Sequence, residues 1–113
     1  MVTETIRSGE FLLSEGNGHI SREEITVASG AGVLEAGQVL GQITASGKYI
    51  AYTPAATDGS EVAAGILYGR VDTTDADAKG VAVVRMAEVK ANSLTGSDAD
   101  AITDFASQSI IVR

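Results

Sequence analysis

Cysteine is absent from the chain of 113 residues, which contains a single histidine and a single proline. Without a thiol, a disulfide framework, thiolate zinc sites and thiol catalysis are all excluded. The histidine, His19, has no second histidine or adjacent acid–base pair at a useful spacing, so neither a metal site nor a nucleophile–base pair can be built around it. We therefore expect His19 to lie at the solvent or at an interface.

Basic residues are few, with 8 Lys and Arg against 15 Asp and Glu, and the formal net charge is −7. The cations are scattered singly, whereas a protein that binds nucleic acid clusters them against phosphates. The first residues lack the basic start and apolar run of a signal peptide, and no apolar run approaches the ~18 residues of a membrane helix. We expect a soluble protein without a cleaved secretion signal and without direct nucleic-acid binding.

Short β-prone segments separated by glycines dominate the rest of the chain, which has 13 glycines. The segments are residues 25–27, 33–44, 48–52, 62–68, 81–89 and 110–112, and the apolar run 62–68 is the best candidate for a buried strand. Gly37 and Gly41 interrupt a strand pattern, which is typical of bulges or bends at the corners of a small barrel. The pattern predicts a mainly β fold, a small β-barrel-like domain.

One short helix is predicted near the C-terminus. Ser97 followed three residues later by Asp100 is a helix-start pattern with Ser97 as the N-cap. Ile102, Phe105 and Ala106 then recur at the spacing of one helix face.

The first 24 residues differ from the rest because they are mostly polar and carry only short apolar runs around the turn signal Asn17-Gly18. A single hairpin of this kind is marginal in water. We therefore predict a flexible N-terminal arm over residues 1–24 and a compact β-rich domain over residues 25–113.

The sequence contains no complete catalytic or ligand-binding motif. Residues 75–86 have acids where a calcium loop begins, but Lys79 and Met86 occupy positions that need oxygen ligands. The glycine-rich stretches match no phosphate-binding loop. A hydrolase would need a positioned base, and His19 lies in the expected arm. The sequence predicts no enzyme, no metal and no cofactor.

Three stretches, residues 11–23, residues 36–41 followed by 47–49, and residues 54–67, occur in an order and spacing that resemble the lambda-type bacteriophage head decoration proteins. The apolar ending at residues 109–113 is also similar. One departure is Leu94-Thr95-Gly96-Ser97-Asp98, where the lambda protein has a tryptophan-proline segment.

The resemblance implies a non-enzymatic homotrimer that binds the major capsid protein on the outside of the expanded head at local threefold sites and stabilises the head against DNA pressure. It places the protein on the outer surface of the virion, and in the bacterial cytoplasm during assembly. It also implies that the arm engages the shell. The arm residues expected to do so are Phe11, Leu12, Leu13, Ser14, His19, Ile20, Ser21 and Arg22.

An alternative is a carrier domain of the biotinyl or lipoyl type, or a small barrel that serves as an interaction domain. Residues 34–43 are similar to the Val-x-x-Gly-Gln-x-Leu rhythm of the carrier family. However, the only lysine placed like a modifiable hairpin tip is Lys48, and it lies in Gly47-Lys48-Tyr49 rather than in the motif that this family requires.

Overall fold

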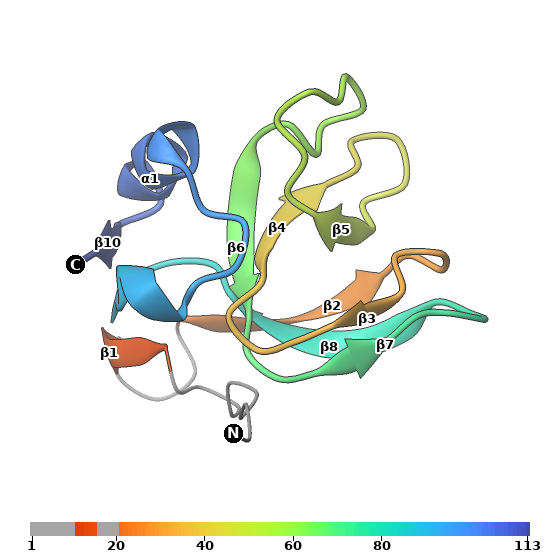
Figure 1. The fold of residues 1–113 in the computed structure, drawn as a ribbon, viewed down its shortest axis with the longest axis horizontal. Helices are drawn as coiled ribbons and strands as arrows, with labels where there is room; N and C mark the ends of the chain where they lie inside the picture. Colours follow the sequence, from red (N-terminus) through yellow and green to blue (C-terminus); the bar gives the residue numbers. More distant parts are fainter. Residues whose placement is uncertain (1–10, 16–20) are drawn as a thin grey trace, which may run out of the picture.

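The computed structural model describes residues 11–15 and 21–113, which fold around a closed five-stranded barrel (Figure 1). The strands are β1 (Leu12–Glu15), β2 (Arg22–Val27), β3 (Val33–Leu34), β4 (Val39–Gln42), β5 (Tyr49–Ala51), β6 (Ala63–Leu67), β7 (Val71–Asp72), β8 (Ala78–Val83), β9 (Ala87–Val89) and β10 (Ile110–Val112). A 3₁₀ turn (Ala91–Ser93) and one α-helix, α1 (Ala99–Ala106), complete the described part. The predicted mainly β, barrel-like fold with one short C-terminal helix is confirmed.

The barrel has the strand order β2-β5-β4-β6-β8. Most neighbours are antiparallel, and β2 pairs with β8 from Arg22↔Val83 to Val27↔Ala78. The barrel closes where β2 meets β5 in parallel, through the single pair Val27↔Tyr49. The predicted buried strand is β6, whose residues Ala63, Ile66 and Leu67 are almost fully buried.

A second sheet, of strand order β1-β9-β10, lies beside the barrel. Strand β9 is antiparallel to β1 and parallel to β10. The prediction of one β segment over residues 81–89 is therefore wrong, because these residues belong to two strands, β8 and β9. The chain turns between them at Met86, whose φ of 52° does not fit a strand.

Two hydrophobic cores follow from this arrangement. The first lies between the barrel, the β1–β9–β10 sheet and α1, and includes Phe11 and Phe105. The second fills the barrel and includes Leu40 and Leu67. Tyr52 packs in the first core and Tyr49 against the second.

Gly41 marks a bend, as its place in the strand pattern predicts. The pairing of β4 with β6 shifts register between Leu40 and Gly41. A Cβ atom at Gly41 would lie 2.5 Å from the carbonyl oxygen of Ser60, so the Ser60 backbone needs the space that only glycine leaves.

Helix α1 begins one residue later than predicted. Asp98 has extended backbone angles and is the N-cap, and its side chain accepts a hydrogen bond from Ala101 N at 2.8 Å. The buried face holds Ala101 and Phe105, while Ile102 is 43% exposed, so the predicted face was wrong in part. Within the described residues no helix is long and apolar enough to cross a membrane.

Side chains of the helix and its C-terminal turn satisfy backbone groups of β6 where β8 no longer pairs with it. Asp104 Oδ2 accepts a hydrogen bond from Ala63 N at 3.0 Å, and Gln108 Nε2 donates to Ala64 O at 2.8 Å. These two contacts attach the segment that leads into β10 to the barrel. They thereby fix one end of the β1–β9–β10 sheet.

Candidate functional site

The residues expected to contact a partner fall into two structural groups. Phe11 is fully buried in the first core, and Leu12 packs against that core as the first residue of β1. Leu13 and Ser14 are exposed. Strand β1 is therefore anchored by two residues and presents the next two to the solvent.

The same division holds where the chain enters the barrel. Ser21 is fully buried and donates from Oγ to the carbonyl oxygen of Met86 at 2.9 Å. Arg22 begins β2, so the predicted arm boundary at residue 24 falls inside a barrel strand. His19 and Ile20 lie outside the residues that the structure describes.

Arg22 connects β1 to the barrel. Its Nε atom donates to Glu15 Oε2 at 3.1 Å, and its guanidinium carbon lies 4.2 Å from the centre of the Tyr68 ring. The hydrogen bond to Glu15 raises the pKa of Arg22, and the cation contacts the ring face favourably. The pair with Glu15 holds the C-terminal end of β1 against β2, and the contact with Tyr68 holds the start of β2 against the segment that follows β6.

An exposed apolar surface lies on the β1–β9–β10 sheet. A bulge between Leu12 and Ser14 adds a residue to β1, so that Leu13 and Ser14 are consecutive exposed positions. Leu13 is 48% exposed and Ile111, on β10, is 50% exposed. We call Leu13, Ser14, Met86, Glu88 and Ile111 the outer sheet face.

A shallow groove of about 420 Å³ crosses the outer sheet face. Its lining residues are Ser14, Glu15, Met86, Ala87, Glu88, Ser109 and Ile111. Glu15 is paired with Arg22, and Glu88 accepts from Arg113 Nε at 3.2 Å. The groove therefore combines the apolar side chains of Met86 and Ile111 with two carboxylates whose charges are paired. Such a mixture of apolar and polar groups also occurs in protein–protein interfaces.

Backbone strain is concentrated in this groove. Among the described residues, Met86 and Ser109 are the non-glycine residues with positive φ, at 52° and 61°. The two segments that carry these residues are hydrogen-bonded to each other, because Ala87 N donates to Ser109 O at 3.2 Å. Such conformations cost about 1–3 kcal/mol each and cluster at functional sites. Here one of them presents Met86, which is 47% exposed, to the solvent.

Of the residues that line the groove, sequence reasoning named only Ser14 and missed Glu15, Met86, Ala87, Glu88, Ser109 and Ile111. Ile111 left a usable signal, because a strand of three consecutive apolar residues must point one of them away from the core. No local pattern predicted Met86 or Ser109, since Met86 lies in the turn between β8 and β9, Ser109 lies in the turn before β10, and the two turns contact each other.

The described part of the chain gives no support for a metal site. Residues 11–15 and 21–113 contain no group of three or more His, Cys, Asp or Glu side chains placed to hold a metal. Asp77, in the loop once considered for calcium, accepts from Ser29 N at 2.8 Å and pairs with Lys48 Nζ at 2.6 Å. These contacts lower the pKa of Asp77, with the Lys48 hydrogen bond first.

Comparison with protein families gives a match to the model described as bacteriophage lambda head decoration protein D, over residues 1–110. The chain belongs to this family. Comparison with curated proteins returned no match. The family is a structural component of the phage capsid, so the chain is a β-rich head decoration protein associated with the capsid of the virion.

Membership changes how the outer sheet face is interpreted. In a head decoration protein, an exposed face of this kind is a candidate contact surface. The carrier-domain alternative is not the family that matches, and Lys48 is held by Asp77 in an ion pair on the barrel surface.

Proposed function

We propose that the chain is a cementing protein that binds as homotrimers to the outside of the expanded head at local threefold sites. The observation that supports this most is the outer sheet face, an exposed surface that joins Leu13 and Ser14 of the arm to the strained residue Met86 and to Ile111. The trimers hold neighbouring subunits of the major capsid protein together.

The mechanism is mechanical and thermodynamic. Packaged DNA pushes the shell outward, and each bridging trimer adds contacts that must break before the subunits separate. A ligand that binds the expanded lattice and not the unexpanded one stabilises the expanded state by mass action. Three copies in one trimer also raise the effective concentration of each binding surface, which offsets a weak single contact.

The contact residues follow from exposure. We assign Leu13, Ser14, Met86 and Ile111 to direct contact with the shell. Phe11 and Ser21 act indirectly, because they are buried and position β1 and the Met86 turn. Arg22 holds Glu15 at the rim. The predicted contacts of His19 and Ile20 remain part of the proposal.

Two measurements test this function. Light scattering on a size-exclusion column should give three times the chain mass of 11.5 kDa. Co-sedimentation should show binding to expanded heads and none to unexpanded shells. The proposal would be contradicted if the trimeric wild-type protein did not bind expanded heads, or if it bound expanded and unexpanded shells equally well.

A matched pair of variants locates the surface. Leu13→Ser combined with Ile111→Ser should weaken binding to expanded heads at least tenfold, because both exposed apolar contacts are removed. Val62→Ser is the control, since Val62 is 51% exposed but lies immediately before β6, outside the outer sheet face. Equal binding by all three proteins would exclude this surface.

A further inference from the structure

Sulfur occurs at two positions of the chain. The sequence contains two methionines, Met1 and Met86, and neither cysteine nor tryptophan. Cysteine and methionine are the side chains that a peroxide oxidises at sulfur, so these two thioethers are the targets that the chain offers. Met1 lies outside the described residues, whereas Met86 belongs to the outer sheet face. The described surface therefore has one position where a mild oxidant can turn an apolar side chain into a polar one.

Met86 is open to small molecules. Its side chain is 47% exposed, and it lines the groove of about 420 Å³ together with Ile111. A water molecule takes up about 30 Å³ in the liquid, and hydrogen peroxide is only slightly larger, so the groove has room for a peroxide beside this side chain. Oxidation is fastest at accessible side chains, and Met86 meets that condition.

The backbone holds the Met86 side chain at the surface. Ser21 Oγ donates to Met86 O at 2.9 Å, and Met86 N donates to Gln108 O at 3.3 Å. The first contact comes from the segment that enters β2, and the second comes from the turn before β10. Ala87, the next residue, is 5% exposed and belongs to the first core. The side chain cannot withdraw without breaking these contacts, so a change in its polarity stays on the outer sheet face.

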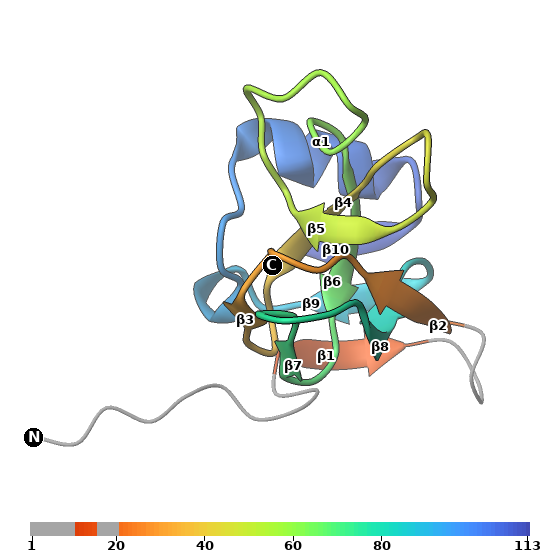
Figure 2. The ribbon, with the colours of Figure 1, turned by 90° about the vertical axis from the view of Figure 1, so that its right-hand side faces the viewer.

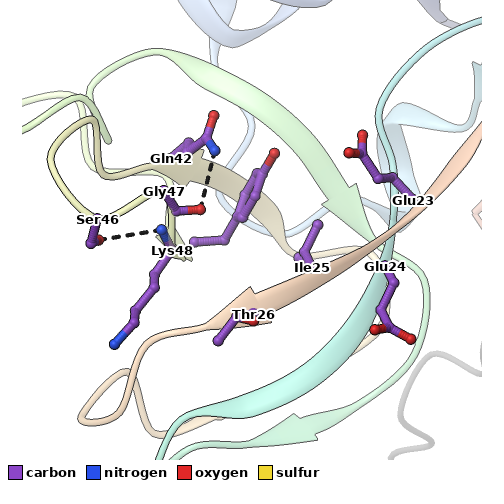
Figure 3. Close-up of a pocket in the computed structure, with 9 residues that line it drawn as sticks. Glu23, Glu24, Ile25, Thr26, Gln42, Ser46, Gly47 and Lys48 are labelled. Carbon is purple, nitrogen blue, oxygen red and sulfur yellow. Dashed lines mark hydrogen bonds between the residues drawn. The ribbon is translucent and has the colours of Figure 1, made fainter.

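A second groove of the molecule is lined by residues without sulfur (Figure 3). It has a volume of about 340 Å³ and lies between β2 and β5. Its charged groups include Glu23 and Lys48, which are paired with Arg85 and Asp77. Strand β5 is on the side of the barrel away from β1 and β10 (Figures 1 and 2). Peroxide therefore modifies the outer sheet face and leaves this second groove unchanged.

We propose that Met86 is a modification site, at which a peroxide converts the thioether to the sulfoxide and thereby weakens the hold of the outer sheet face on the shell. A lone pair of the sulfur attacks one oxygen of hydrogen peroxide, and the S–O bond forms as the O–O bond breaks. The departing hydroxide takes up the proton left on the transferred oxygen and becomes water. Sulfur loses two electrons and the peroxide gains them. This inference rests on the proposed binding of the outer sheet face to expanded heads.

The sulfoxide opposes binding because it adds a polar oxygen to an apolar contact. The oxygen accepts hydrogen bonds, and the neighbouring Ile111 side chain has no donor to satisfy it. Burial of such an acceptor against the shell without a donor weakens binding by at least about tenfold. Conversely, a shell seated on the outer sheet face shields Met86 from peroxide. Modification and binding therefore exclude each other at this residue.

Peroxide footprinting of the full-length chain tests the site itself. Dilute hydrogen peroxide is added to the folded protein, to the protein unfolded in denaturant and to decorated expanded heads, and an added methionine peptide reports the peroxide dose. Mass spectrometry of proteolytic fragments then gives the sulfoxide fraction at Met86 over time. Met86 should react within about tenfold of its unfolded rate in the free protein, and at least about tenfold more slowly on the heads. A resistant Met86 in the free protein, or equal rates on and off the heads, would overturn the inference.

Binding of the oxidised protein tests the consequence. Oxidised wild type should bind expanded heads at least about tenfold more weakly than the untreated protein, and methionine sulfoxide reductases should restore the binding. Unchanged binding after complete oxidation of Met86 would overturn the inference and leave the proposed function intact. An untreated wild type that does not bind expanded heads would overturn the proposed function.

Met86→Leu separates Met86 from Met1. The variant keeps an apolar side chain of similar volume and has no sulfur at this position. Each protein is compared with itself before and after peroxide, and the affinity of M86L should change by less than about twofold. An equal loss in wild type and M86L would assign the effect to Met1 and overturn the inference. If M86L does not bind heads, the fragments decide, because the loss of wild-type binding must then follow sulfoxide at Met86 in time and not sulfoxide at Met1.

Discussion

The phenol of Tyr52 donates a hydrogen bond to Asp98 Oδ1 at 3.0 Å, although the two residues are far apart in the sequence. The same carboxylate oxygen caps α1 by accepting from Ala101 N. One side chain thus joins the end of the barrel to the start of the helix. Because the chain from α1 leads directly into β10, this contact helps to position the outer sheet face.

Stability at high pH should depend on Tyr52. Burial, followed by the hydrogen bond to Asp98, raises the pKa of Tyr52 to about 12 from its ordinary value of 10.0. A raised folded-state pKa stabilises the fold fully below pH 10, and this contribution is lost as the pH rises from 10 to 12. The difference in unfolding free energy between wild type and Tyr52→Phe should shrink over that interval in denaturant titrations. A constant difference would contradict the assignment.

Removal of the cap should destabilise the fold. Asp98→Ala deletes the helix cap and the hydrogen-bond acceptor of Tyr52, for a combined cost of about 1–3 kcal/mol. Asp100→Ala is the control, because Asp100 is exposed in the first turn of the same helix and should cost less than about 1 kcal/mol. If Asp98→Ala and Asp100→Ala lost equal free energies of unfolding in chemical denaturation, Asp98 would act only through its charge near the helix N-terminus.

The absence of a side chain at Gly41 should be essential for the stability of the fold. An added Cβ atom would lie 2.5 Å from Ser60 O, so Gly41→Ala should lower stability by more than about 3 kcal/mol or prevent folding. Gly32→Ala separates this steric effect from backbone strain. Gly32 has a φ of 80° but open space around its Cβ position, so a loss of only about 1 kcal/mol is expected. Thermal unfolding that ranks Gly32→Ala as the worse variant would refute the steric explanation.

The contact between α1 and β6 should tolerate an amide but not a methyl group. Asp104 Oδ2 accepts from the N–H of Ala63, a residue that is only 2% exposed. Asp104→Ala leaves that donor unpaired at a cost of about 1–3 kcal/mol. Asp104→Asn retains a carbonyl oxygen that can accept the bond and should lose much less. Similar midpoints for both variants in urea would mean that the hydrogen bond contributes little.

Much of the fold was predictable because short-range patterns determine it. The apolar run that became β6, the bend at Gly41 and the final strand β10 all followed from periodicity and glycine placement. The helix was found, but Asp98 and Ser97 are both good caps, and the choice depended on Tyr52, which approaches from the barrel. The interruption at Met86 depends on contacts with Ser21 and the β10 turn, which no local pattern encodes.

The proposed contact surface was harder to predict than the fold. Leu13 and Ser14 were identified through the family resemblance, but their exposure results from a bulge against β9. Phe11 had the same sequence signal and is buried instead. Whether an apolar residue anchors a strand or contacts a partner is decided by tertiary packing, so single residues of the arm could not be separated in advance.

The central claim is that the chain decorates the expanded head through the outer sheet face. Cryo-electron microscopy of expanded heads incubated with the protein tests it most directly. The account predicts trimeric density on the outside of the shell at local threefold positions, with β1, β9 and β10 against the capsid subunits. Density that places another face of the barrel against the shell, or undecorated heads at saturating protein, would contradict it.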